Sequence, residues 1–72
     1  MNPNEVAYQM YIREYNAMPE SFTKTEKHET AKKIAITKCK SVISCYDSDK
    51  YNPNVKYYNL VLESLKMINA PN

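Results

Sequence analysis

The residues of this chain that could do chemistry are aromatic and cationic rather than catalytic. The 72-residue sequence contains seven tyrosines, and Tyr8, Tyr11 and Tyr15 recur at helical spacing. Tyrosine rings stack on nucleobases, and lysine and arginine pair with phosphates. The candidate ligand-binding residues are Tyr8, Tyr11, Arg13, Tyr15, Lys32, Lys33 and Lys40. A tyrosine stripe is also typical of a helix core whose hydroxyl groups reach the surface, so both interpretations stay open.

Groups typical of enzyme sites are scarce. His28 is the single histidine, and we expect it to pack or hydrogen-bond on the apolar side of a helix. His28 and Cys39 are eleven residues apart, about 16 Å along one helix, which is too far to share a metal. The absence of glycine excludes the glycine-rich phosphate loops. We therefore expect a protein that is not an enzyme, with no catalytic residues, no metal and no cofactor.

The two cysteines and the hydropathy of the chain indicate the cellular compartment in which we expect the protein. Cys39 and Cys45 are six residues apart and would point about 240° away from each other on a helix, so an intrachain disulfide would break that helix. No apolar run approaches the ~20 residues of a membrane span, and no signal peptide is evident. We expect reduced thiols and a cytoplasmic protein.

The longest expected helix covers residues 24–46, and we expect the other helices to pack against it. Thr23 and Glu26 have the spacing of a capping box at its start. The segment holds six lysines against Glu26 and Glu29, whereas residues 1–20 are acidic, so the lysines either attract an anion or match the acidic segment. Ala31 and Ala35 would let a second helix approach closely.

Two shorter helices are expected on either side, over residues 3–18 and 53–68. Each opens with Asn-Pro-Asn, which supplies an N-cap and a proline at the first helical position. This repeat reflects either an internal duplication or shared capping rules. Residues 47–51 form a connecting loop. Glu14 falls within the apolar arc of its helix and should pair with Lys38, and Leu60 and Met67 form an apolar strip that a monomer would expose.

These elements predict one all-α domain over residues 1–72, built as a helical hairpin plus an N-terminal helix. A core in so short a chain rarely supplies more than about 3–5 kcal/mol. Apolar surface is left over on the first and third helices. We therefore expect a homo-oligomer.

The chain resembles small accessory proteins of bacteriophages with AT-rich genomes, which are short, lack glycine and are rich in Asn, Lys, Tyr and Ile. Residues 35–45, a loop and a Tyr-rich helix are similar to the helical hairpins of such proteins, and this covers roughly half of the chain. Some of these proteins are oligomeric anti-defence sponges that sequester cyclic nucleotide immune signals without degrading them. No site motif of those sponges matches this chain, so the resemblance assigns no residue.

The sequence thus predicts a phage-type anti-defence protein that sequesters a cyclic nucleotide, such as a cyclic dinucleotide, in the host cytoplasm. The site would lie between copies, with tyrosines stacking and Lys or Arg pairing to phosphate. Two alternatives remain open. One is a helical inhibitor that contacts a host protein directly, and the other is a sequence-independent nucleic-acid binder, which the low net charge of +2 makes the weaker of the two.

Overall fold

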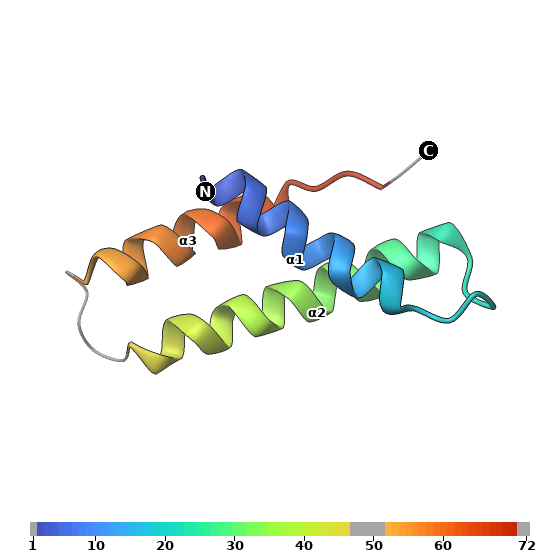
Figure 1. Cartoon of the computed structure of the whole chain (residues 1–72), viewed down its shortest axis with the longest axis horizontal. Coiled ribbons are helices and arrows are strands. Elements are labelled where there is room, and N and C mark those ends of the chain that lie inside the picture. The colour runs from blue at the N-terminus through green and yellow to red at the C-terminus, as the bar shows by residue number, and fades with distance from the viewer. Residues whose placement is uncertain (1, 47–51, 71–72) are drawn as a thin grey trace.

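A computed structural model describes residues 2–46 and 52–70, and within them the chain forms three α-helices and no strand. They are α1 (Pro3–Ala17), α2 (Lys24–Cys45) and α3 (Pro53–Lys66) (Figure 1). The predicted three-helix, all-α architecture is confirmed. The predicted loop at residues 47–51 lies outside the described residues. No helix of the described part is long and apolar enough to cross a membrane.

The helices begin where the sequence predicts and end slightly earlier. The side chain of Asn2 accepts from the N–H of Glu5 at 2.9 Å, and Thr23 and Glu26 form both bonds of the capping box. The predicted ends at residues 18, 46 and 68 are one or two residues too late. Met18 has extended backbone angles because it precedes Pro19, which disfavours the helical conformation there. Tyr46 and Met67 are C-caps rather than helical residues.

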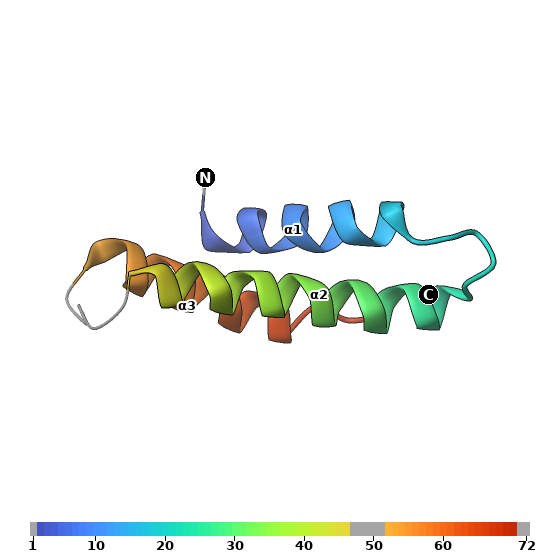
Figure 2. The same ribbon diagram turned by 90° about the horizontal axis from the view of Figure 1, so that it is seen from below.

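The helices run alternately up and down the molecule. α2 is antiparallel to both of its neighbours, so α1 and α3 run in the same direction (Figure 1). Seen from below, α1 lies across the layer that α2 and α3 form (Figure 2). All three pairs of helices contact each other. The C-terminal segment, residues 67–70, leaves α3 and runs on past α1.

The core is small because α2 contributes mainly small side chains to it. Ala31, Ala35 and Cys39 recur every four residues along α2 and are wholly buried. They let the larger side chains of the neighbouring helices approach the α2 backbone. The buried apolar residues of the described chain are Ala7, Tyr11, Ala31, Ala35, Cys39, Val61 and Leu65. Ala31 and Ala35, the small residues expected at a helix contact, are indeed wholly buried.

Two predicted surface features are also present. Lys38 and Glu14 form a salt bridge between α2 and α1, with the Glu14 side chain 14% exposed. This pairing compensates a carboxylate that is largely withdrawn from water. The apolar strip on α3 is exposed as predicted, with Leu60 at 51% and Met67 at 78%. Tyr8, the first tyrosine of the stripe on α1, is 57% exposed.

Candidate functional site

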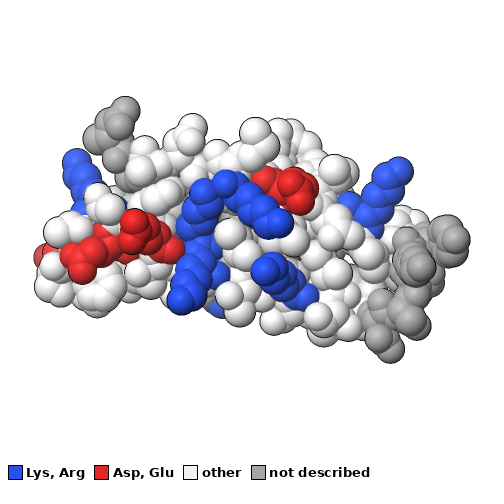
Figure 3. All heavy atoms as spheres, turned by 180° about the vertical axis from the view of Figure 1, so that it is seen from behind, with Lys and Arg blue, Asp and Glu red and all other residues white. Residues whose placement is uncertain are grey.

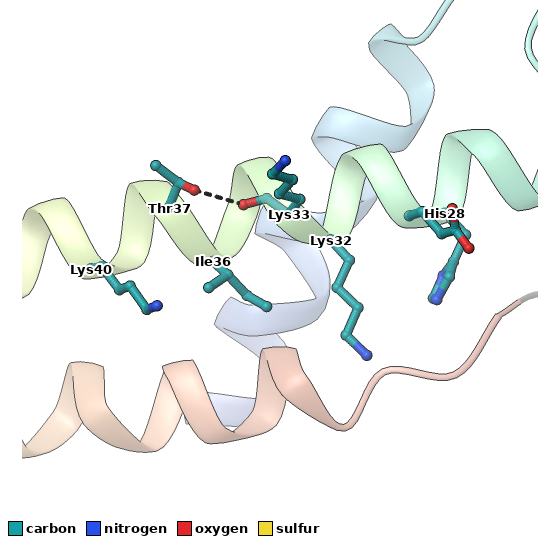
Figure 4. A pocket seen from close by; sticks show the side chains of 7 residues that line it. His28, Lys32, Lys33, Ile36, Thr37 and Lys40 are labelled. Carbon is teal, nitrogen blue, oxygen red and sulfur yellow. Dashed lines mark hydrogen bonds between the residues drawn. The ribbon is translucent and has the colours of Figure 1, made fainter.

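The predicted lysines gather in one open groove along α2. Seven residues line this lysine groove, which has a volume of about 580 Å³: His28, Glu29, Lys32, Lys33, Ile36, Thr37 and Lys40. Lys32, Ile36 and Lys40 lie four residues apart and therefore share one row of the helix. Their side chains extend toward α3, whereas Lys33 and Thr37 lie on the other edge of α2 (Figure 4). The groove thus brings three lysines together with one acidic residue, Glu29.

The lysine groove lies on the side of the molecule away from α1. Figure 3 shows this side, where Lys and Arg atoms gather over its middle, with acidic atoms beside them and more acidic atoms over one end. The separation of charge follows from the sequence of α2, whose acidic residues Glu26 and Glu29 occur in its first two turns. Such a local excess of positive charge attracts anions over a distance of about one Debye length.

Lys32 is the lysine of the groove that also connects α2 to the C-terminal segment. Its Nζ donates to the backbone carbonyl of Ile68 at 3.0 Å, 36 positions away in the sequence. Lys33 and Lys40 are both exposed; the Lys40 side chain extends toward α3, whereas that of Lys33 lies on the other edge of α2 (Figure 4). The Thr37 hydroxyl donates a hydrogen bond to the backbone carbonyl of Lys33 at 2.9 Å within the helix (Figure 4). The free cationic groups of the groove are thus those of Lys33 and Lys40.

The predicted tyrosines line a second, smaller pocket. This tyrosine pocket, of about 300 Å³, is lined by Tyr8, Tyr11, Ile12, Tyr15, Ile68 and Asn69. The three rings follow one another along α1, with centroids 6.4 Å apart between Tyr8 and Tyr11 and 5.9 Å between Tyr11 and Tyr15. Lys27 Nζ lies 5.8 Å from the centroid of the Tyr15 ring, within cation–π range. The pocket thus offers aromatic surface beside a cation.

A buried hydrogen bond lies between the two cavities. The Tyr11 hydroxyl lies 2.8 Å from Nδ1 of His28, and the rings of the two residues meet edge to face at 5.5 Å. Burial raises the pKa of Tyr11 above its ordinary 10.0, and the neighbouring Tyr15 and Tyr8 add to the shift, so the phenol stays neutral. The structure confirms that His28 is a packing and hydrogen-bonding residue. Tyr11 lines the tyrosine pocket and His28 lines the lysine groove.

The predicted site residues therefore form two adjoining cavities rather than one. Tyr8, Tyr11 and Tyr15 meet at the tyrosine pocket, and Lys32, Lys33 and Lys40 meet in the lysine groove. The Tyr11–His28 hydrogen bond and the Lys32–Ile68 hydrogen bond separate them. Arg13 is exposed on α1 and lines neither cavity.

Some lining residues were not predicted from the sequence. Ile68 and Asn69 reach the tyrosine pocket because the C-terminal segment runs on past α1 after α3 ends, which no local pattern indicates (Figure 1). Lys27 could have been found, because the start of α2 must lie beside the end of α1 when a short loop joins two antiparallel helices. The other additions are His28, Glu29, Ile36 and Thr37 in the groove and Ile12 in the tyrosine pocket, and each lies within about one turn of a predicted site residue.

In the described residues, the cysteines form no disulfide and the acidic residues form no cluster of metal ligands. Cys39 donates to the carbonyl of Tyr58 at 3.3 Å, and burial raises the pKa of its thiol. Cys45 is exposed, and both cysteines are free. Within residues 2–46 and 52–70, no three His, Cys, Asp or Glu side chains come together as metal ligands would. What the two cavities offer a ligand is therefore charge and aromatic surface.

Comparisons of this chain with protein-family models, with curated proteins and with solved structures found no match.

Proposed function

We propose that this chain is a non-enzymatic protein that binds and sequesters a small anionic nucleotide. The ligand we favour is a cyclic nucleotide signal of bacterial immunity, such as a cyclic dinucleotide, and the context is a bacteriophage anti-defence role in the host cytoplasm. In this proposal the ligand is held in a homo-oligomer. Its phosphates pair with Lys33 and Lys40, and its base stacks in the tyrosine pocket of the same or a neighbouring copy.

The observation that carries the proposal is the adjacency of a cationic groove and an aromatic pocket. A nucleotide combines the two matching chemistries, because its phosphates are anionic and every base has a face that stacks. The groove volume of about 580 Å³ lies within the range of ~300–1,000 Å³ that is usual for small-molecule sites. Both cavities are open at the surface, so a ligand can enter without a change of fold.

The length of the cationic row favours a small ligand over a nucleic acid. Lys32 and Lys40 are eight residues apart, which places their Cα atoms about 12 Å from each other. Beyond Lys32, toward the start of α2, Glu29 lines the same groove and would repel a continuing phosphate backbone. A compact ligand that stays between Lys32 and Lys40 avoids this repulsion.

The test is calorimetric titration of the protein with a panel of cyclic dinucleotides and cyclic trinucleotides and their linear forms. We expect binding to one of the cyclic forms, and a loss of about tenfold or more in affinity for Lys33→Gln and for Lys40→Gln, because each removes a charged hydrogen bond. Lys56→Gln is the matched control, since Lys56 is an exposed lysine of α3 outside the groove. Equal losses in all three variants would contradict a site in the lysine groove.

A further inference from the structure

One hydrogen bond links a residue of the lysine groove to a wall of the tyrosine pocket. Lys32 lines the groove, and its Nζ donates to the backbone carbonyl of Ile68 at 3.0 Å. Figure 4 shows this side chain reaching from α2 toward the segment that follows α3. Ile68 lines the tyrosine pocket together with Asn69. A cation of the first cavity is therefore bonded to the backbone that forms part of the second.

This wall of the pocket belongs to the C-terminal segment, residues 67–70, which has few other bonds to the rest of the protein. The N–H groups of Met67 and Ile68 donate back to carbonyls in the last turn of α3. The Ile68 side chain is partly buried against the core, whereas Asn69 is exposed. Within the described residues, the hydrogen bond that joins this segment to α2 comes from Lys32. The position of the wall thus depends in part on Lys32.

The Lys32 ammonium can hold this carbonyl and an anion at the same time. A lysine has three N–H donors, and the Ile68 carbonyl takes one of them. The carbonyl is neutral, and the salt bridges among the described residues are formed by Lys38 and Lys66, so no carboxylate neutralises Lys32. The bond to Ile68 also holds the ammonium in place, so less side-chain entropy is lost when an anion binds.

We propose that Lys32 couples the two cavities, such that an anion bound to it in the lysine groove holds residues 67–70 against the tyrosine pocket. The anion binds best to the state in which the Ile68 carbonyl already positions the ammonium. By linkage, the bound anion favours that state, and a ligand that fixes the wall of the pocket strengthens anion binding by the same factor. This deepens the proposed function, on which its meaning for a nucleotide rests: a phosphate at Lys32 would keep the wall of the base site in place.

The experiment uses inorganic pyrophosphate as the probe, because it supplies negative charge without a base that could stack. Amide hydrogen exchange of the full chain is followed by NMR at Met67 and Ile68, with and without the anion, and calorimetric titration establishes the saturating concentration. In the wild type, saturating pyrophosphate should slow exchange at these two amides by about fivefold or more, a factor at the lower end of usual coupling strengths.

Lys32→Met and Lys33→Met form the matched pair, since each removes one ammonium from neighbouring positions of the groove. Both should weaken pyrophosphate binding, so affinity alone does not separate them. In Lys33→Met the bound anion should still slow exchange at Met67 and Ile68. In Lys32→Met exchange should be fast and unaffected by the anion. Loss of helicity in Lys32→Met would be met with Lys32→Gln, in which the anion should again have no effect.

Four results would overturn the proposal. Pyrophosphate that does not bind would remove the groove as an anion site. Binding without any change in exchange would show that the cavities are independent, and faster exchange would show that the anion takes Lys32 away from Ile68. Equal slowing in Lys32→Met would assign the coupling to another residue. Failure of the proposed function is read separately, from the titration with cyclic nucleotides, because pyrophosphate has no base.

Discussion

At the scale of single residues, the Tyr11–His28 pair explains how a polar ring can lie in so small a core. Tyr11 is 4% exposed and His28 is 8% exposed, and each supplies the other's hydrogen-bonding partner at 2.8 Å. Small side chains at Ala31 and Ala35 leave room for these rings between α1 and α2. An unpaired polar group in the same position would carry its full desolvation cost.

Tyr11→Phe should therefore destabilise the protein by about 1–3 kcal/mol, because it leaves a buried nitrogen of His28 without its partner. Tyr8→Phe removes the same atom from a ring that is 57% exposed, and a change of this kind at the surface usually stays within about 0.5 kcal/mol. Urea unfolding followed by circular dichroism measures both. Equal midpoints for the two variants would show that the hydrogen bond contributes nothing to stability.

Lys32 and Lys33 are neighbours with different roles. Lys32 donates to the carbonyl of Ile68 and so fastens the C-terminal segment to α2, whereas Lys33 is exposed. Lys32→Met keeps the aliphatic stem and should lower stability by about 1 kcal/mol, the usual net value of such a bond. Lys33→Met should leave the unfolding midpoint unchanged. Hydrogen exchange at the amides of residues 67–70 should also speed up in Lys32→Met alone, and unchanged exchange there would argue against the fastening role.

At the scale of elements, the start of α2 is held by a capping box that depends on pH. The Thr23 backbone N–H donates to the Glu26 carboxylate at 2.9 Å and, with the Thr23 side-chain hydrogen bond, holds the Glu26 pKa below its ordinary 4.5. The lowered pKa means that the folded state prefers the charged form. Its contribution to stability is complete above the ordinary pKa and is lost as the pH falls through the lower folded pKa.

Glu26→Gln tests this linkage, because glutamine can form a capping box but does not titrate. Wild type and variant should differ in unfolding free energy at neutral pH, and the difference should shrink as the pH falls toward about 3. Chemical unfolding at a series of pH values gives both curves. Two curves that stay parallel over this range would show that Glu26 is not the titrating group of the cap.

The elements also show which features can be predicted from the sequence. The helix starts follow from Asn2, Thr23 and Asn52, because capping is a local interaction within three residues. The Glu14–Lys38 pair was predictable because each residue occupies a polar position within an apolar arc. Helix ends were predicted one or two residues too late, since the last turn depends on local geometry that propensity does not resolve.

The arrangement of the candidate site depended on contacts that are distant in the sequence. The separation of tyrosines and lysines into two cavities results from the path of residues 67–70, which Lys32 fixes from 36 positions away. No periodic pattern encodes this contact. The exposure of Tyr8 has a similar origin, because the tyrosine stripe of α1 is wider than the surface that α2 and α3 cover.

At the scale of the whole molecule, α1 lies across the layer formed by α2 and α3, and the surface differs in chemistry from one side to another (Figure 2). The lysine groove occupies the side away from α1 (Figure 3), and the exposed large apolar residues of the described chain lie on α1, on α3 and just after α3: Tyr8, Leu60 and Met67. The tyrosine pocket touches both regions through Tyr8 and the Tyr11–His28 bond.

The measurement that tests the central claim most directly is equilibrium binding of cyclic dinucleotides to the wild-type protein, followed by mass spectrometry of the recovered ligand. The account predicts saturable binding of a cyclic form, weakened in Lys33→Gln and Lys40→Gln but not in Lys56→Gln, with the ligand released chemically intact on denaturation. No binding of any cyclic nucleotide at concentrations well above that of the protein, or recovery of a cleaved ligand, would contradict it.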